Sequence, residues 1–162
     1  KLCWKIGEQF PKQARYENDV YGKLMAQKKA EEWVKNLSGE YSDIASQKTV
    51  GKGTEAWKWY NGKIDPIWAK EELSKITGTT GYNWPANYAT VDKGLNMLPP
   101  AHIHARARRW VVKLFLSHLL EIMYIDHNGK RCPDPYIIKE GHTGRIGVPF
   151  LAEWLHDEGI EL

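Results

Sequence analysis

Residues 99–124, PPAHIHARARRWVVKLFLSHLLEIMY, carry the strongest structural signal in this chain. The two prolines lead into a helix that we expect to run from about residue 101 to 125. Apolar side chains cover nearly every side of the part from 110 to 124, and only four residues interrupt them: Lys113, Ser117, His118 and Glu121. Because a helix that is apolar all round is normally buried, the stretch predicts a central buried helix.

The residues before this stretch also favour helices. Apolar residues recur at helical spacing over 16–37, and Gly39 follows as a stop signal. Residues 65–78 begin with Asp-Pro and end in Gly, which is typical of a second helix. We expect a strand or an N-terminal arm over residues 1–12, and a loop with one helical turn over residues 38–53.

Only short segments indicate β structure. Asn61-Gly62 is a turn signal that would suit a hairpin, and the apolar run at 136–138 would suit a strand. Residues 77–100 form a long irregular loop of the kind that is usually functional or mobile, and a last helix is expected over 149–156. The predicted fold class is therefore mainly α, with α+β containing a hairpin or small sheet as the alternative, in one domain spanning 1–162.

Composition limits the class of protein. The chain is 42% hydrophobic and 12% aromatic, which is typical of a globular protein and not of a disordered one. A net charge of +3 falls short of a dedicated DNA-coating protein. The two distant cysteines, Cys3 and Cys132, favour reduced thiols in a cytoplasmic protein. We also expect no membrane span and no signal peptide.

Three arginines mark the candidate binding site. Arg106, Arg108 and Arg109 lie in the first turns of the central helix, where the positive end of the helix dipole disfavours cations. They therefore need an anion, which can be a carboxylate of this protein or a phosphate of a partner. If the anion is a carboxylate, we expect a structural network of ion pairs; if it is a phosphate, we expect contact with nucleic acid.

Nucleic-acid binding is the leading hypothesis. In it the three arginines contact the phosphates of DNA or RNA, and Lys113 extends the basic patch. An aromatic residue of the long loop, Trp84, would stack on an unpaired base. Under this hypothesis the chain is a small intracellular binding domain.

Histidines suggest a second hypothesis, a histidine- or metal-dependent hydrolase or nuclease. All six histidines fall between His102 and His156, and helical spacing places His104 and His118 on one stripe. Burial would keep His118 neutral, as a ligand or general base requires, although a core histidine bonded to a carbonyl is the alternative. Candidate catalytic residues are His104, His118 and Tyr124, and candidate ligands of a divalent metal are His102 and His104.

The segment His102-Ile103-His104 resembles the His–hydrophobic–His motif of the HUH endonucleases. The resemblance implies that two histidines on a strand bind a divalent metal and that a downstream tyrosine, Tyr124 or Tyr136, attacks DNA. The surrounding sequence instead predicts a helix, in which alternate residues point about 200° apart.

Two further possibilities complete the set. A metal site of His127, Cys132 and His142 has a spacing that matches no common zinc pattern. The third hypothesis for the whole chain is a non-catalytic assembly subunit of a phage or mobile-element complex, in which the arginines bind carboxylates of neighbouring subunits.

Overall fold

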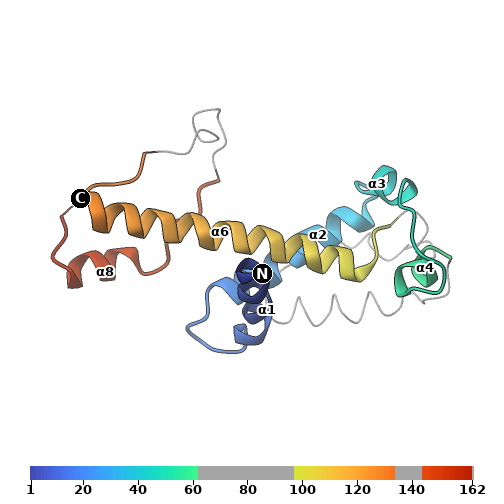
Figure 1. The fold of residues 1–162 in the computed structure, drawn as a ribbon, viewed down its shortest axis with the longest axis horizontal. Helices are drawn as coiled ribbons and strands as arrows, with labels where there is room; N and C mark the ends of the chain where they lie inside the picture. Colours follow the sequence, from blue (N-terminus) through green and yellow to red (C-terminus); the bar gives the residue numbers. More distant parts are fainter. Residues whose placement is uncertain (62–96, 134–143, 162) are drawn as a thin grey trace. The chain divides into compact units, whose positions relative to one another are not determined.

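The computed structural model describes residues 1–61, 97–133 and 144–161 of the chain. Within these ranges the chain forms six helices and no strand, so the predicted mainly α class is confirmed (Figure 1). The helices are α1 (Leu2–Gln13), α2 (Tyr21–Leu37), α3 (Ser42–Ser46), α4 (Glu55–Tyr60), α6 (Pro100–Asn128) and α8 (Leu151–Asp157).

The chain divides into two compact units, Lys1–Val112 and Lys113–Leu162, and each is described by itself. Helix α6 begins in the first unit and ends in the second. The single domain expected over 1–162 stays a prediction. None of the described helices is long and apolar enough to cross a membrane.

The core of the first unit joins α2, α3 and α4 to the start of α6. Trp33 and Trp59 meet edge to face there, with ring centroids 6.4 Å apart. Burying one large apolar side chain of this kind stabilises a fold by about 1.5–3 kcal/mol. The core residues are Ala30, Trp33, Tyr41, Ala45, Trp59, Met97, Leu98 and Ile103.

Polar contacts fix the chain just before α6. The side-chain amide of Asn36 donates to the carbonyl of Leu98 at 2.9 Å, and the Leu98 N–H donates back to Asn36 Oδ1 at 2.8 Å. The indole of Trp59 donates to the carbonyl of Met97 at 2.9 Å. Because these groups are buried, the bonds satisfy backbone atoms that would otherwise lack a partner. They determine where α6 begins.

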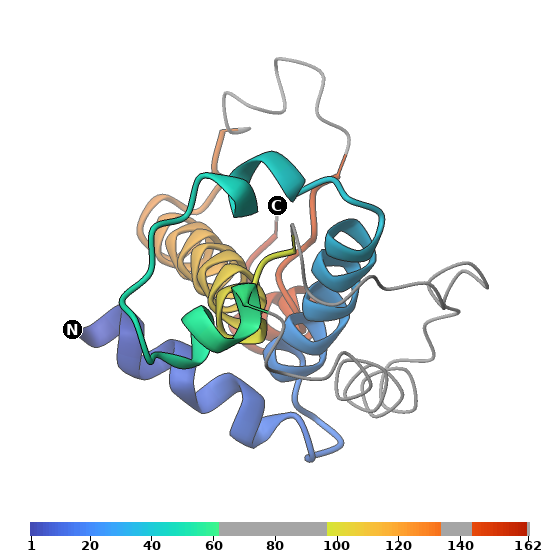
Figure 2. The ribbon, with the colours of Figure 1, turned by 90° about the vertical axis from the view of Figure 1, so that its right-hand side faces the viewer.

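Helices α1 and α2 flank the first turns of α6 (Figure 2). Gly7 is buried, and a Cβ at this position would lie 2.8 Å from Cγ of Arg108, so glycine permits the close approach of α1 to α6. Phe10, one turn further on, contacts the ring of Tyr21 with centroids 5.5 Å apart.

The expectation of a strand near the N-terminus is therefore wrong. Residues 2–13 are helical, and Pro11 lies inside the helix rather than separating two elements. Gly7 and Phe10, three residues apart, place one face of this helix on its neighbours. Packing against α2 and α6 decides the structure of a segment whose own apolar pattern is too short to do so.

Several helices lie where the sequence predicts them. Helix α2 ends before Gly39, whose φ of +86° suits the predicted stop. Helix α3 is the single turn expected between 38 and 53, and α6 and α8 confirm the central and last helices.

The structure does not support a hairpin at Asn61-Gly62, because residues 55–60 before this turn form helix α4 and not a strand. Thr54 caps this helix by accepting the Trp57 N–H at 3.2 Å. The expected helix at 65–78, the strand at 136–138 and most of the loop at 77–100 lie outside the described residues.

In the second unit α6 is buried on one face only. His118, Glu121 and Ile125 are buried, together with Val148 from the chain after the helix. Four large apolar side chains of α6 are exposed: Leu116, Leu119, Leu120 and Met123. We call these four residues the apolar stripe. Burial on all sides, as expected from the sequence, is therefore not reached within the described chain.

Candidate functional site

Arg106 points into the first unit and binds an acidic residue there. Its Nε–H donates to Oε2 of Glu32, and its terminal nitrogen donates to the Tyr41 hydroxyl at 3.2 Å. The Tyr41 hydroxyl in turn donates to Glu32 Oε2 at 2.8 Å. The guanidinium lies 4.4 Å from the centroid of the Tyr41 ring, within the range of a cation–π contact. This group closes α2 against α6.

The contacts among Arg106, Glu32 and Tyr41 change the pKa values of Glu32 and Tyr41. Burial alone would raise the pKa of Glu32, but hydrogen bonds from Arg106 and Tyr41 and the charges of Arg106 and Lys28 lower it below 4.5. Burial and the hydrogen bond to Glu32 raise the pKa of Tyr41 to about 12. At neutral pH the carboxylate is therefore charged and the phenol is protonated.

Arg108 has a different acidic partner. Its NH1 donates to Oε1 of Glu8 on α1, and its guanidinium lies 5.6 Å from the centroid of the Trp4 ring. The side chains of Arg108 and Glu8 keep 21% and 33% of their surface exposed, whereas the Glu32 side chain keeps 7%. The two carboxylates thus differ: Glu8 is in contact with water and Glu32 is nearly buried, although Arg106 itself keeps 31% of its side-chain surface exposed.

Arg109 is exposed, and its charge acts on His102 together with those of Lys48 and Arg106. Burial lowers the pKa of His102, and the charges of Lys48, Arg109 and Arg106 lower it further. Lys48 is exposed and follows α3, which the core residue Ala45 attaches to the start of α6. We call Lys48, His102 and Arg109 the basic cluster.

His104 has a second set of charged neighbours. Burial lowers its pKa, the charges of Lys29 and Arg108 lower it further, and Glu8 opposes them. Cations thus act on both imidazoles in the first turns of α6, in addition to burial, and at His104 a carboxylate opposes them.

The arginines thus separate into two kinds. Arg106 and Arg108 have carboxylate partners in this chain, as the structural alternative expects, and Arg109 is exposed. Their role toward nucleic acid stays a prediction. Lys113 is the exposed first residue of the second unit, and Trp84 lies outside the described residues. Sequence reasoning missed Lys48, Glu8 and Glu32, because only the packing of α1, α2 and α3 brings them to α6.

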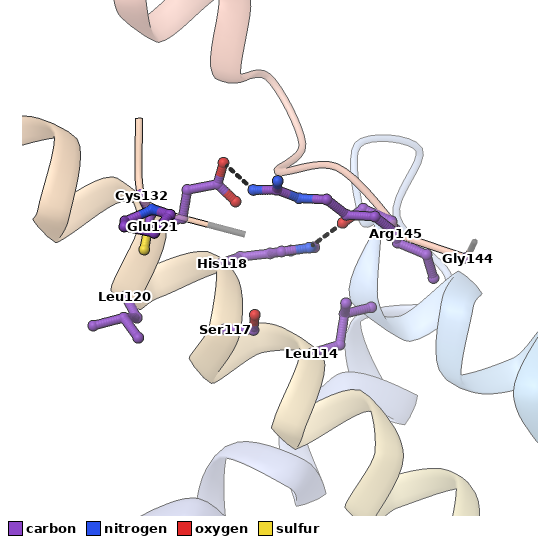
Figure 3. A pocket seen from close by; sticks show the side chains of 10 residues that line it. Leu114, Ser117, His118, Leu120, Glu121, Cys132, Gly144 and Arg145 are labelled. Atoms are coloured by element: carbon purple, nitrogen blue, oxygen red, sulfur yellow. Dashed lines mark hydrogen bonds and ion pairs between the residues drawn. The ribbon is translucent and has the colours of Figure 1, made fainter. Parts of the chain in front are cut away.

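The second unit contains a pocket of about 210 Å³ beside α6 (Figure 3). His118 and Glu121 both extend from α6 toward the segment 144–146. His118 is 2% exposed, and its Nε2–H donates to the carbonyl of Ile146 at 2.9 Å. Arg145 donates to Oε1 of Glu121 at 2.6 Å. His118 is therefore bonded to a carbonyl, as the structural alternative for this residue expects.

His118 and Glu121 are of residue types that can act in catalysis, but in this structure both bind the segment 144–146 to α6. The two bonds hold 144–146 against α6, and Cys132, a free cysteine, completes the lining together with Ser117. Among the described residues no three His, Cys, Asp or Glu side chains lie close enough to hold a metal ion.

The resemblance to HUH endonucleases fails on local structure. His102 and His104 lie on helix α6 and not on a strand, so their side chains point to different sides of the element. Tyr124 is half-buried on α6 in the second unit, while Tyr136 and His142 lie outside the described residues.

Comparison with known proteins adds no assignment. The chain matches no protein-family model, and no curated protein or solved structure is significantly similar to it.

Proposed function

We propose that the protein binds nucleic acid through its phosphate backbone, and that the basic cluster at the start of α6 makes the contact. The observation that carries the proposal is that Arg109 and Lys48 are both exposed and that both charges act on His102, adding to the effect of burial in lowering the pKa of this imidazole. Arginine binds phosphate with two parallel hydrogen bonds, and lysine adds a point charge.

Contact with the phosphate backbone predicts two properties of the binding. Phosphate contacts are independent of base sequence and depend on salt, because each one releases condensed counterions. The net charge of +3 is modest, so the positive potential must be local to attract the backbone. Arg106 is assigned no contact, since its guanidinium is held by Glu32 and Tyr41.

The test measures affinity for a labelled duplex and a labelled single strand across a salt series. Arg109→Ala and Lys48→Ala should each reduce the slope of log K against log salt by about 0.9 for duplex DNA. Lys12→Ala removes the same charge from an exposed position on α1 and serves as the control. Slopes identical to that of the unaltered protein in both variants would refute the proposal.

A second candidate function, a non-catalytic assembly subunit, is favoured by the apolar stripe. Leu120 and Met123 each have 60% of their surface exposed, and the four residues of the stripe recur at the spacing of one helix face. Exposed apolar faces of this kind mark protein interfaces. Light scattering after size exclusion should give a mass above 18.7 kDa that Leu120→Ser reduces; a monomer in both cases argues against this candidate.

A further inference from the structure

The two ion pairs at the start of α6 differ in how easily they can open. Glu32 has two hydrogen-bond donors, Arg106 and Tyr41, and it lies in the interior between α2 and α6. Removing Arg106 would leave this nearly buried carboxylate with only the Tyr41 hydroxyl at 2.8 Å and Lys28 at 3.8 Å as partners, which is costly. Glu8 keeps a third of its side-chain surface in water, so water can replace Arg108 as its partner.

Helix α1, which carries Glu8, has a small buried surface. Of its twelve residues only Gly7 and Phe10 are buried, and Leu2 and Trp4 expose 71% and 60% of their surface. Segments with few buried apolar contacts open locally at a lower free energy than the core. Opening of α1 would therefore release Arg108 while the Glu32 group stays closed.

We propose that Glu8 masks Arg108 from nucleic acid, so that α1 is an autoinhibitory element whose release adds a further phosphate contact to the basic cluster. This inference rests on the proposed function. The chemistry supports it, because a carboxylate and a phosphate offer the same pair of acceptor oxygens to the planar guanidinium. An acidic side chain can therefore occupy an arginine in place of a phosphate.

The neighbours of Arg108 support the same assignment. Lys29 and Arg108 both face His104, and Glu8 is the group that opposes their positive charges there. Release of Glu8 would remove the negative charge that opposes Arg108 beside this imidazole. The guanidinium of Arg108 would then be available to an anion from solution.

The experiment compares Glu8→Gln with Glu17→Gln in binding to the labelled duplex across the salt series. Both variants lose one negative charge, but Glu17 is an exposed residue of the connection to α2 with no ion pair among the described residues. Glu8→Gln should bind more tightly, and its slope should be steeper by about 0.9. Arg108→Ala should cancel this gain when it is added to Glu8→Gln.

A second variant displaces α1 from α6 without changing any charge. Gly7→Ala places a methyl group 2.8 Å from Cγ of Arg108 and should push α1 away from α6. It should steepen the slope in the same direction as Glu8→Gln, with helix content checked by circular dichroism. This variant decides the matter if Glu8→Gln does not fold.

The outcomes separate this inference from the proposed function. If Arg109→Ala reduces the slope but Glu8→Gln behaves as Glu17→Gln, the inference is overturned and the proposed function stands. If only Glu8→Gln binds the duplex, the masking holds and the contact at Arg109 in the unaltered protein is refuted. If neither protein binds, both are overturned.

Discussion

The side chain of Asn36 and the backbone of Leu98, 62 residues apart in sequence, are joined by two buried hydrogen bonds. The amide group of asparagine offers a donor and an acceptor at the same spacing as a peptide unit. Asn36 thus bonds both backbone polar groups of Leu98, two residues before α6, as a peptide unit of a neighbouring chain segment would. This contact sets where the central helix starts, and with it the position of the arginines and histidines that follow.

Asn36→Ala should therefore destabilise the first unit strongly. The change leaves the N–H and the carbonyl of Leu98 buried without partners, at about 1–3 kcal/mol for each group. Urea denaturation followed by tryptophan fluorescence measures the loss. Ser38→Ala removes an exposed hydroxyl bonded to the carbonyl of Lys35 and should cost far less. Equal losses in the free energy of unfolding would mean that water forms hydrogen bonds with the Leu98 backbone in Asn36→Ala.

Truncating Arg106 and truncating Arg108 should have unequal effects on stability. Arg106→Ala leaves Glu32 charged and nearly buried, which costs about 3–5 kcal/mol. Arg108→Ala leaves Glu8 with a third of its side chain in water, and the expected cost is about 0–1 kcal/mol. Both free energies of unfolding come from the same urea series. An equal or reversed order would contradict the distinction between a closed and an open ion pair.

Tyr41→Phe should shift acid unfolding to higher pH. The hydroxyl is one of the donors that lower the pKa of Glu32, so its loss moves that pKa back toward 4.5. Because a lowered carboxyl pKa stabilises the fold above 4.5 and loses this effect as pH falls through the folded value, the variant loses stability earlier on acidification. The cost at neutral pH is about 1.5–3 kcal/mol for a hydrogen bond to a charged group. Tyr16→Phe, at an exposed position, is the control for the acid titration.

Stability should also fall as pH decreases below 6.5. Burial and nearby cations lower the pKa of both His102 and His104 from that value, so below it the unfolded chain binds more protons than the folded one. The free energy of unfolding then decreases with pH until the folded pKa values are reached. His102→Asn with His104→Asn should flatten this part of the profile, and His127→Asn, at an exposed position, should not. A profile that stays steep in the double variant would assign the dependence to other groups.

His118→Ala should loosen the segment 144–148, which packs on α6 in the second unit. The imidazole bond to the Ile146 carbonyl helps hold residues 144–148 on α6, and its loss should cost about 1 kcal/mol locally. Hydrogen exchange of amides in 144–148 should become roughly fivefold faster, because local opening scales with that free energy. Ser117→Ala, on an exposed neighbour, should leave exchange unchanged. Unchanged exchange in His118→Ala would show that Arg145 and Glu121 suffice.

Much of the fold follows from local sequence patterns. The spacing of apolar residues predicts α2 and α6, and Gly39 predicts the end of α2, because helix periodicity and the left-handed preference of glycine are properties of short segments. The strand expected near the N-terminus is wrong, and residues 55–60, which a hairpin at Asn61-Gly62 would need as a strand, are helical. The patterns of these segments are short, so contacts distant in sequence decide their conformation. Thr54 was a usable signal for α4, as a capping residue ahead of Glu55.

Local sequence patterns suffice to predict that this protein is mainly helical, that one long helix is central, and that this helix begins with arginines that require an anion. Tertiary packing is needed to identify the anions: Glu32 for Arg106, Glu8 for Arg108, and no carboxylate among the described residues for Arg109. The difference arises from distance along the chain. Helical periodicity fixes which residues share a face of one helix, whereas the partner of a charge is set by which other helix packs there.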